Sequence, residues 1–276
     1  MIRIAILMST YTGSRYISEQ FDSIISQSYV DWDLYVRDDA STDNTIEIIK
    51  EYAIKDVRIH FIEDTVKRGA CGGFMWLLQF VDAPFYMFCD QDDVWCNDKV
   101  ELTIAKMLQQ NDATTSPLIV CSDLRVVDAE LNTLYESLWM QRHFTYDMFN
   151  NKYFHLVYNN VTGCTIMLNK IAKDVSIPYP SNINIHDSWI TCSVLWNGGR
   201  VVPIDRTTIL YRQHSSNAIG TKPVPSLSDQ FLRLKSLLIK TKREHSVAYQ
   251  LTGICFFKFL LVKIYYMLRI HAGKLL

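Results

Sequence analysis

Three aspartates stand within residues 90–93, directly after the apolar run 84–89. They are Asp90, Asp92 and Asp93. The run predicts a buried strand, so the carboxylates would lie at the edge of a sheet, where ligands bind in open α/β folds. Because three anions so close together repel one another, a divalent cation that prefers oxygen ligands, Mg²⁺ or Mn²⁺, would stabilise them. An acidic turn that caps the next helix is the alternative, although Asp98 and Glu101 already fit a capping box there.

Two further polar turns follow runs that predict strands at residues 2–8 and 33–37. Helix-like apolar spacing comes after each turn, and this alternation predicts βαβ units, hence an α/β fold with a mostly parallel sheet flanked by helices. In such a sheet the turns that lead from strand to helix share one edge, so the three polar turns should converge. The polar residues of the first two turns are Ser9, Thr10, Tyr11, Asp38, Asp39 and Ser41.

The other elements follow from the same patterns. We expect helices at 17–25, after a capping box at Asn44 and Glu47, after a loop at 69–73, at 100–108 and at 187–196. Strands are expected at 58–62, at 118–127 with a break near Ser122, at 163–168, at 200–204 and at 208–212.

The 276 residues carry a net charge of -1, which does not indicate nucleic-acid binding. Residues 222–276 nevertheless hold 10 Lys/Arg and 2 Asp/Glu, and their apolar residues form helical stripes. The segment 251–270 is long enough to span a bilayer, but Lys258 and Lys263 would be costly at mid-membrane. We therefore expect basic amphipathic helices on an anionic membrane surface, with packing on the protein or a homodimer contact as alternatives.

The seven cysteines include no CxxC pair, and several lie inside apolar runs. Those inside apolar runs are Cys89, Cys121, Cys164 and Cys192, and they are interpreted as reduced core residues of a cytoplasmic protein. The N-terminus, with a single Arg3 and a short apolar run at 4–8, does not read as a secretory signal. The expected location is the cytoplasm, peripheral to the inner face of the cell membrane.

Together the turns resemble the inverting nucleotide-sugar glycosyltransferases of family 2, which have the GT-A fold with its Rossmann-like sheet. The matching segments are Ser9-Thr10-Tyr11, Arg37 to Asp43, Asp90-Gln91-Asp92-Asp93 in the position of the family's DxD motif, and His186-Asp187-Ser188-Trp189. The resemblance implies a glycosyltransferase domain at 1–217, with a nucleotide-binding half at 1–110 and an acceptor half at 111–217. The basic helical tail would occupy 218–276.

Within the family, three motifs look most similar to bacterial rhamnosyltransferases of cell-surface polysaccharide assembly, such as O-antigen or capsule. These motifs are Asp90 to Trp95, Thr162 to Thr165 and Tyr211 to Asn217. The segment 67–73 departs from the pattern, because it carries glycines where relatives often carry Lys-Asn, so backbone N–H groups and Arg68 are expected to contact the donor. Gln230 and Arg233 are followed by Leu234, where processive synthases carry Trp, so the enzyme is expected to be non-processive.

The resemblance also implies roles on the donor side. Asp92 and Asp93 would hold Mg²⁺ or Mn²⁺, which stabilises the charge of the departing diphosphate. Asp90 would lie near the ribose or metal with Gln91 beside it. His214 is a further candidate ligand, and a surface histidine is the alternative.

Nucleotide contacts are expected from the first two turns. Asp39 would accept from the N3–H of uracil or thymine, Ser9 would support it, and Asp38 would be structural. Loop and helix capping is the alternative for these carboxylates.

On the acceptor side, Asp187 is the expected general base for the attacking hydroxyl, with helix N-capping as the alternative. His186, Trp189 and Trp95 would line the sugar or acceptor site, although Trp189 fits a core position equally well. A single base opposite the leaving group predicts direct displacement with inversion.

The leading hypothesis is transfer of L-rhamnose from dTDP-rhamnose to a lipid-linked glycan, and a UDP-hexose transferase is the nearest alternative. A sugar-1-phosphate nucleotidyltransferase would need a Gly-rich phosphate loop, and residues 9–15 offer only Gly13. A non-catalytic nucleotide-sugar or membrane-binding module would be favoured by loss of the acidic cluster or of Asp187, and both are present.

Overall fold

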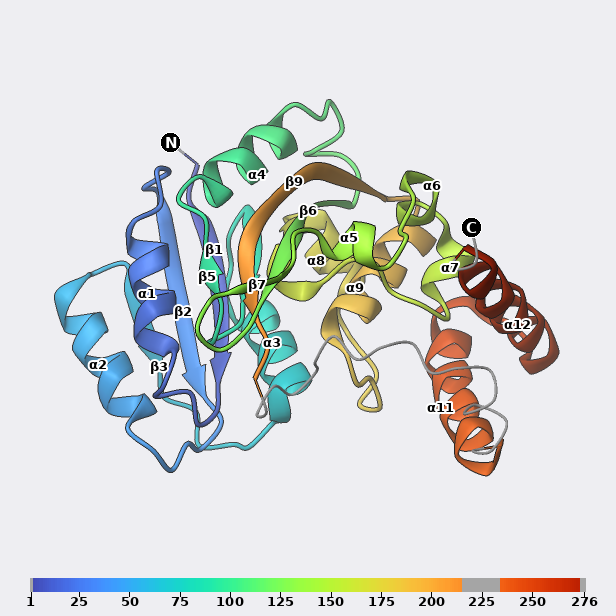
Figure 1. The fold of residues 1–276 in the computed structure, drawn as a ribbon, viewed down its shortest axis with the longest axis horizontal. Coiled ribbons are helices and arrows are strands. Elements are labelled where there is room, and N and C mark those ends of the chain that lie inside the picture. The colour runs from blue at the N-terminus through green and yellow to red at the C-terminus, as the bar shows by residue number, and fades with distance from the viewer. Residues whose placement is uncertain (1, 215–233, 274–276) are drawn as a thin grey trace.

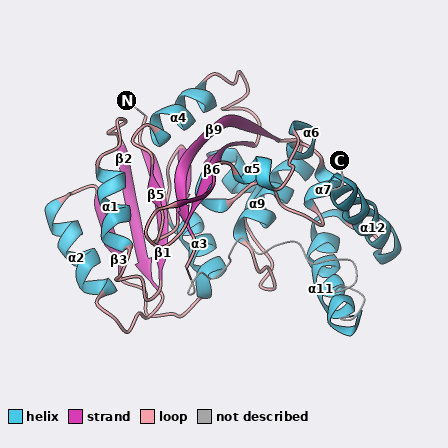
Figure 2. Ribbon diagram, viewed as in Figure 1, coloured by secondary structure: helices cyan, strands magenta, loops and turns pink. Residues whose placement is uncertain are grey.

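The computed structural model describes residues 2–214 and 234–273, in which nine strands form a single sheet with helices on both faces (Figures 1 and 2). The predicted domain boundary at 217/218 and the pair Gln230 and Arg233 lie outside the described residues. The strands are β1 (Ile4–Thr10), β2 (Trp32–Asp38), β3 (Ile59–Ile62), β4 (Phe85–Cys89), β5 (Val94–Trp95), β6 (Leu118–Val127), β7 (Thr133–Tyr135), β8 (Ile166–Asn169) and β9 (Arg200–Arg212).

The sheet is mixed and mostly parallel, with the order β3-β2-β1-β4-β8-β6-β9-β5 and with β7 paired to β6. Strands β1, β2, β3, β4, β6 and β9 run in one direction, and β5, β7 and β8 run in the other. The parallel part is built from βαβ units, as the alternation of patterns predicts. The α/β prediction is therefore confirmed.

The helices cover both faces of the sheet. They are α1 (Ile17–Ile25), α2 (Thr45–Lys55), α3 (Gly69–Phe80), α4 (Lys99–Leu108), α5 (Leu138–Gln141), α6 (Tyr146–Phe149), α7 (Lys152–His155), α8 (Lys170–Ser176), α9 (His186–Trp196), α11 (Leu234–Thr252) and α12 (Phe256–Gly273). Even positions of β1 pack with α1, α2 and α4, and odd positions pack with α3, α8 and α9. This alternation buries both faces of the strand and explains its continuous apolar sequence.

Several local expectations are wrong. The segment 69–73 is the first turn of α3, not a loop, and residues 163–165 form a 3-10 turn before β8. Strand β6 is continuous, although its register with β9 shifts at Ser122, and β9 runs unbroken over 200–212.

The two capping boxes do not form. Asn44 and Asp98 occupy the N-cap positions of α2 and α4, but neither side chain accepts a backbone hydrogen bond there. Asp43 accepts from the N–H of Thr45 instead, at 3.2 Å. Asp98 pairs with Arg206, a residue from a distant part of the chain.

The C-terminal helices α11 and α12 lie at the end of the molecule opposite to α2 (Figure 1). They pack on α7 and α9 through Phe259 and Tyr266, among other side chains. In the described part of the chain, no individual helix has the length and apolar character to cross a membrane. The pair formed by 237–252 and 256–270 meets that test jointly, with a bend of 113° between its halves.

Candidate functional site

The three polar turns meet at one edge of the sheet, as the parallel topology requires. Thr10 of β1 lies opposite Asp38 of β2, and the Thr10 hydroxyl donates to the Asp38 carboxylate at 2.7 Å. The Gln91 side chain accepts from the N–H of Tyr11 at 2.9 Å and donates to its carbonyl at 3.0 Å. Ser41 accepts from the N–H of Thr12 at 2.8 Å. Side chains therefore join the turns before any ligand binds.

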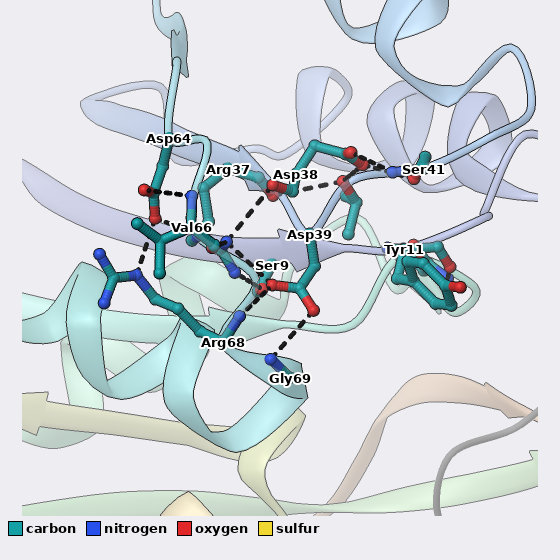
Figure 3. Close-up of polar contacts among 12 residues, drawn as sticks. Ser9, Tyr11, Arg37, Asp38, Asp39, Ser41, Asp64, Val66, Arg68 and Gly69 are labelled. Atoms are coloured by element: carbon teal, nitrogen blue, oxygen red, sulfur yellow. Dashed lines mark hydrogen bonds and ion pairs between the residues drawn. The ribbon is translucent and has the colours of Figure 1, made fainter.

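The fully buried guanidinium of Arg37 lies at the centre of this region (Figure 3). It donates to Ser9 Oγ at 3.1 Å and to Asp39 Oδ1 at 3.0 Å. It also donates to the carbonyl of Val66 at 2.9 Å and pairs with Asp64 at 3.3 Å. A charge buried this deeply is stable only because each of these acceptors is in place.

Asp39 joins β2 to the start of α3 (Figure 3). Its Oδ1 accepts from the N–H of Arg68 at 2.6 Å and its Oδ2 from the N–H of Gly69 at 2.9 Å. Burial raises the pKa of this carboxyl, but these donors and Arg37 outweigh it and hold the pKa below its usual value. A carboxylate has about four acceptor positions, so one remains for the predicted contact with a base N3–H, which stays a prediction.

A cavity of about 660 Å³ opens at this edge. The predicted site residues that line it are Ser9, Thr10, Tyr11, Asp39, Asp90, Gln91, Asp92, His186 and Asp187. The predicted residues that lie outside its lining are Asp38, Ser41, Arg68, Asp93, Trp95, Trp189 and His214. Arg68 instead lines a second cavity of about 390 Å³ over the first turn of α3. Asp38 accepts from both the N–H and the hydroxyl of Ser41, so these two residues shape the turn.

The acidic cluster after β4 is compact. Ligand atoms of Asp90, Asp93 and Cys164 all lie within 4.8 Å of one another. Loss of water, followed by the charges of Asp92 and Asp187, raises the pKa of Asp90 to about 7. Burial and the same kind of repulsion raise the pKa of Asp93 well above its usual range. These carboxylates would lose their repulsion if a cation bound beside them.

Asp92 and His214 come together although 122 positions separate them, with His214 Nε2 at 2.8 Å from Asp92 Oδ2. The imidazole packs on the ring of Tyr16, with centroids 4.7 Å apart. Arg212 fixes the acidic loop from β9, because its N–H donates to Asp93 at 3.0 Å and its Nε to the Asp92 carbonyl at 2.8 Å. The His214 side chain is therefore held at the acidic turn.

This donor set fits Mg²⁺ or Mn²⁺. Carboxylate oxygens of Asp90 and Asp92 suit both ions, and the imidazole of His214 favours Mn²⁺, the softer of the two. Cys164 would suit a softer metal, and burial raises the pKa of its thiol well above the usual value. Asp93 is fully buried behind the cavity wall, and its role as a direct ligand stays a prediction.

Asp187 is the second residue of α9, and the N-cap position belongs to Ile185, so N-capping does not explain it. Its residue is 8% exposed and lines the cavity. Burial raises its pKa to about 6 against the donors that lower it, which include the N–H of Gly163 and the Asn159 amide. A carboxyl of this pKa is charged at neutral pH and remains a usable base.

His186 lines the cavity beside Asp187, stacked on Phe74 with ring centroids 4.4 Å apart. Burial lowers its pKa to about 3, so the ring is neutral. Neither tryptophan lines the cavity, so the prediction for Trp95 is wrong and the core alternative for Trp189 is confirmed. Trp95 packs in the core under α1 and α4, and Trp189 donates through Nε1 to the Ser176 carbonyl at 2.8 Å inside the opposite core. Both indoles are large apolar groups that the helices cover, so neither reaches the cavity.

Sequence reasoning missed most of the wall of the cavity beyond Asp187, where it had singled out only the motif that contains Thr162 and Gly163. The lining residues there are Leu138, Arg142, Phe144, Tyr158, Asn159, Thr162, Gly163 and Ile270. They come from short helices and loops without a regular pattern, and Ile270 comes from α12. Two adjacent asparagines, 159 and 160, stand inside an otherwise apolar stretch, and they were the feature of the sequence that could have indicated this part of the cavity wall.

Comparisons with known proteins bear on this site. The model of Glycosyl transferase family 2 matches residues 5–176. The dTDP-rhamnosyl transferase RfbG of Shigella flexneri is 31% identical over 229 residues, which are 77% of this chain and 73% of RfbG. The UDP-Glc:alpha-D-GlcNAc-diphosphoundecaprenol beta-1,3-glucosyltransferase WfgD of Escherichia coli is 34% identical over 108 residues, 39% of this chain and 42% of WfgD. The match to WfgD thus spans less than half of that protein.

The fold is similar to that of the mannosyltransferase PcManGT from Pyrobaculum calidifontis, solved in complex with GDP-Man and Mn²⁺. The TM-score is 0.63 at 16% identity, over 99% of this chain and 72% of that one. The family model covers more than half of the chain, and the turns that it includes are those that line the cavity. The chain therefore belongs to glycosyl transferase family 2, the family of nucleotide-sugar glycosyltransferases that its sequence resembles.

Proposed function

We propose that this protein is a metal-dependent, inverting glycosyltransferase of bacterial surface polysaccharide synthesis. It transfers a single sugar, L-rhamnose from dTDP-rhamnose, to a lipid-linked oligosaccharide. The observation that carries the proposal is one cavity lined both by the three polar turns and by the carboxylate of Asp187. The turns offer groups for a nucleoside diphosphate, and Asp187 offers a base for a hydroxyl.

Different residues of the chain act on the acceptor and on the donor. Asp187 accepts the proton of the acceptor hydroxyl as the oxygen attacks the anomeric carbon. The diphosphate leaves towards the turns after β1 and β4, on the side opposite the base, so the configuration inverts. Asp92 and His214 would hold Mg²⁺ or Mn²⁺, which supplies positive charge next to the departing diphosphate.

The donor is the finer part of the proposal. A relative named for dTDP-rhamnose matches 77% of the chain, whereas WfgD, named for UDP-Glc, matches 39% at slightly higher identity. RfbG combines more than 30% identity with coverage of more than two thirds of both chains, and this combination favours rhamnose. UDP-glucose is the second candidate, because a further E. coli glucosyltransferase, WfaP, is 25% identical over 86% of the chain.

A donor-release assay tests the function. The purified protein is incubated with dTDP-rhamnose or UDP-glucose, with Mn²⁺ or EDTA, and with a lipid-diphosphate-linked N-acetylglucosamine acceptor analogue. We expect Mn²⁺-dependent release of dTDP, with slow donor hydrolysis even where the analogue is a poor acceptor. Release of UDP alone would move the donor to glucose. No release from either donor would contradict a catalytic role.

The proposal places the protein at the cytoplasmic face of the membrane, and α12 supports this location. Its outward face carries apolar side chains at helical spacing, and the opposite face packs on the protein through Phe259 and Tyr266. The exposed apolar residues are Phe257, Leu261, Ile264, Tyr265 and Leu268. Exposed basic residues nearby are Lys240, Lys242, Arg243 and Lys258. An apolar stripe flanked by cations fits an anionic lipid surface.

Flotation with liposomes tests this location. Leu261→Glu with Leu268→Glu should abolish binding to vesicles that contain anionic lipid. Ile54→Glu on α2, at a residue 84% exposed, is the matched control and should bind as the native protein does. Equal flotation of the native protein and both variants would indicate that the apolar face of α12 contacts protein and not lipid. A native dimer that only the α12 variant fails to form would indicate the same.

A further inference from the structure

The loop before β8 contacts both oxygens of Asp187. Asn159 Nδ2 donates to Asp187 Oδ1 at 3.0 Å, and the N–H of Gly163 donates to Asp187 Oδ2 at 2.8 Å. We propose that Asn159 and Gly163 are positioning residues for the base, which fix the direction of the Asp187 carboxylate and keep its charged form available. This inference rests on the proposed function.

The orientation of the Asn159 amide is determined by its other contacts. Its Oδ1 accepts from the N–H of Val161 at 3.1 Å, and its Nδ2 donates to the Val161 carbonyl at 2.8 Å. Because the N–H of Val161 needs an acceptor, the amide oxygen Oδ1 must face Val161. The amide nitrogen Nδ2 therefore faces Asp187. The loop presents a donor, not an acceptor, to the carboxylate.

Gly163 is required for a steric reason. A Cβ at this position would lie 2.6 Å from His186 Nε2 and 3.4 Å from Asp187 Oδ2. The His186 ring is held between Phe74 and Phe88, with centroids 4.4 and 4.8 Å away, so it cannot move aside. The absence of a side chain at 163 lets the backbone N–H reach the carboxylate.

Several titratable groups line the same cavity as Asp187, and the two cations Lys67 and Arg142 are among them. The others are Tyr11, Asp39, Cys71, Asp90, Asp92, Tyr158, His186 and Tyr211, and Cys164 lies beside Asp90. Burial raises the pKa of the Cys71 thiol to about 12 and lowers that of His186 to about 3, so both are neutral. Asp90 is the neighbour whose charge couples to Asp187, and a substitution at 159 leaves it unchanged.

The test is the pH dependence of kcat for Asn159→Asp and Asn159→Ala. Asn159→Asp keeps the acceptor for Val161 but places a second carboxylate about 3 Å from Asp187, so the acidic limb should move up by about 1 pH unit or more. Asn159→Ala should lower kcat by about tenfold or more, because the carboxylate loses its fixed direction. Donor binding, measured as KM, should change little.

Asn150→Ala is the matched control. Asn150 also clamps one residue through both backbone groups, with bonds of 2.9 and 2.8 Å to Val201, but it does not line the cavity. It should lose stability without moving the pH profile. Folded Asn159 variants with native kcat and an unmoved acidic limb would overturn the inference, and Asn159→Ala decides it alone if Asn159→Asp does not fold.

A readout without turnover separates this inference from the proposed function. The ¹³C carboxyl signal of Asp187, assigned by its loss in Asp187→Asn, should titrate at higher pH in Asn159→Ala than in the native protein. A native protein that transfers no sugar would refute the function, and this titration would still decide the inference. Equal titration midpoints would overturn it.

Discussion

The carboxylates after β2 and those around Asp90 lie at the same edge of the sheet, but they differ in their hydrogen-bond donors. Asp39 accepts from Arg37, Arg68 and Gly69, and Asp43 accepts from Ser14 and Thr45. Burial raises the pKa of both carboxyls, yet the donors prevail and both pKa values are lowered.

The second group shows the opposite balance. Burial raises the pKa of Asp90 to about 7 and that of Asp187 to about 6. Asp187 accepts from Asn159 and Gly163, but there the loss of water outweighs the donors. The comparison teaches that an acidic motif alone does not identify a functional carboxylate. Carboxylates whose donors outweigh the loss of water hold loops together, whereas those for which the loss of water prevails can take a cation or a proton.

The largest effect is expected from a substitution of Asp187, one of the carboxylates whose pKa is raised. Asp187→Asn should lower sugar transfer by about 10²–10⁴-fold, because the amide cannot accept the hydroxyl proton. Fold and nucleotide binding should remain, since the turns after β1 and β2 are untouched. Steady-state transfer and the thermal unfolding midpoint measure the two properties. Transfer at the native rate would leave Asp187 with a structural role.

Removal of the cation should have the next largest effect. Asp92→Asn should abolish metal-dependent turnover, with a loss of about 10²-fold or more, because one oxygen ligand becomes an amide nitrogen or a neutral oxygen. Treatment of the native protein with EDTA should give a similar rate, and added Mn²⁺ should restore only the native protein. Full activity of the variant in Mn²⁺ would remove Asp92 from the candidate ligands.

Substitution of Asp39, one of the carboxylates whose pKa is lowered, should reduce the stability of the fold instead. Asp39→Asn should lower the free energy of unfolding by about 2–3 kcal/mol, since Arg37 loses its buried partner and the start of α3 loses an acceptor. Urea denaturation measures this, and Asp82→Asn, at an exposed pair with Lys170, is the control. A variant with native stability and a lower kcat would show that Asp39 acts in the reaction and does not stabilise the fold.

The smallest effect is the dependence on pH. Asp187 works as a base only when charged, so kcat should fall tenfold per unit as the pH drops below about 6. The stability that Asp39 and Asp43 provide is present above their unfolded pKa of about 3.9 and is lost below it, as the pH falls through their lower folded values. Between pH 4 and 6, therefore, activity should fall while these two carboxylates still stabilise the fold. A flat kcat down to pH 5 would contradict the assignment.

The edge of the sheet was predictable because strand ends are visible in local patterns. The runs before residues 9 and 90 are mostly apolar, the run before residue 38 has the apolar centre 34–36, and polar turns follow each of them. The partners of each carboxylate were not predictable. Asp39 meets Gly69 across 30 positions, Asp187 meets Asn159 across 28, and Asp93 meets Arg212 across 119.

The tryptophan error has the same origin. Trp95 and Trp189 stand next to motif residues in the sequence, but β5 and α9 direct the indoles into the core. Proximity to a motif along the chain does not show in which direction a side chain points, because strand β5 and helix α9 each present side chains to opposite sides. Asn159 was missed for the converse reason, since it belongs to an irregular loop whose direction depends on the rest of the fold.

The most direct test of the account is nucleotide binding with and without Mn²⁺, measured by thermal shift or calorimetry with dTDP and UDP. A ligand that binds the folded state alone raises the unfolding midpoint by mass action. We expect dTDP to bind the native protein and Asp187→Asn in the presence of Mn²⁺, and to bind neither Asp92→Asn nor the metal-free native protein. Binding that is equal with and without Mn²⁺, or absent for every nucleotide, would contradict the assignment of the acidic turn after β4 to a cation and a nucleoside diphosphate.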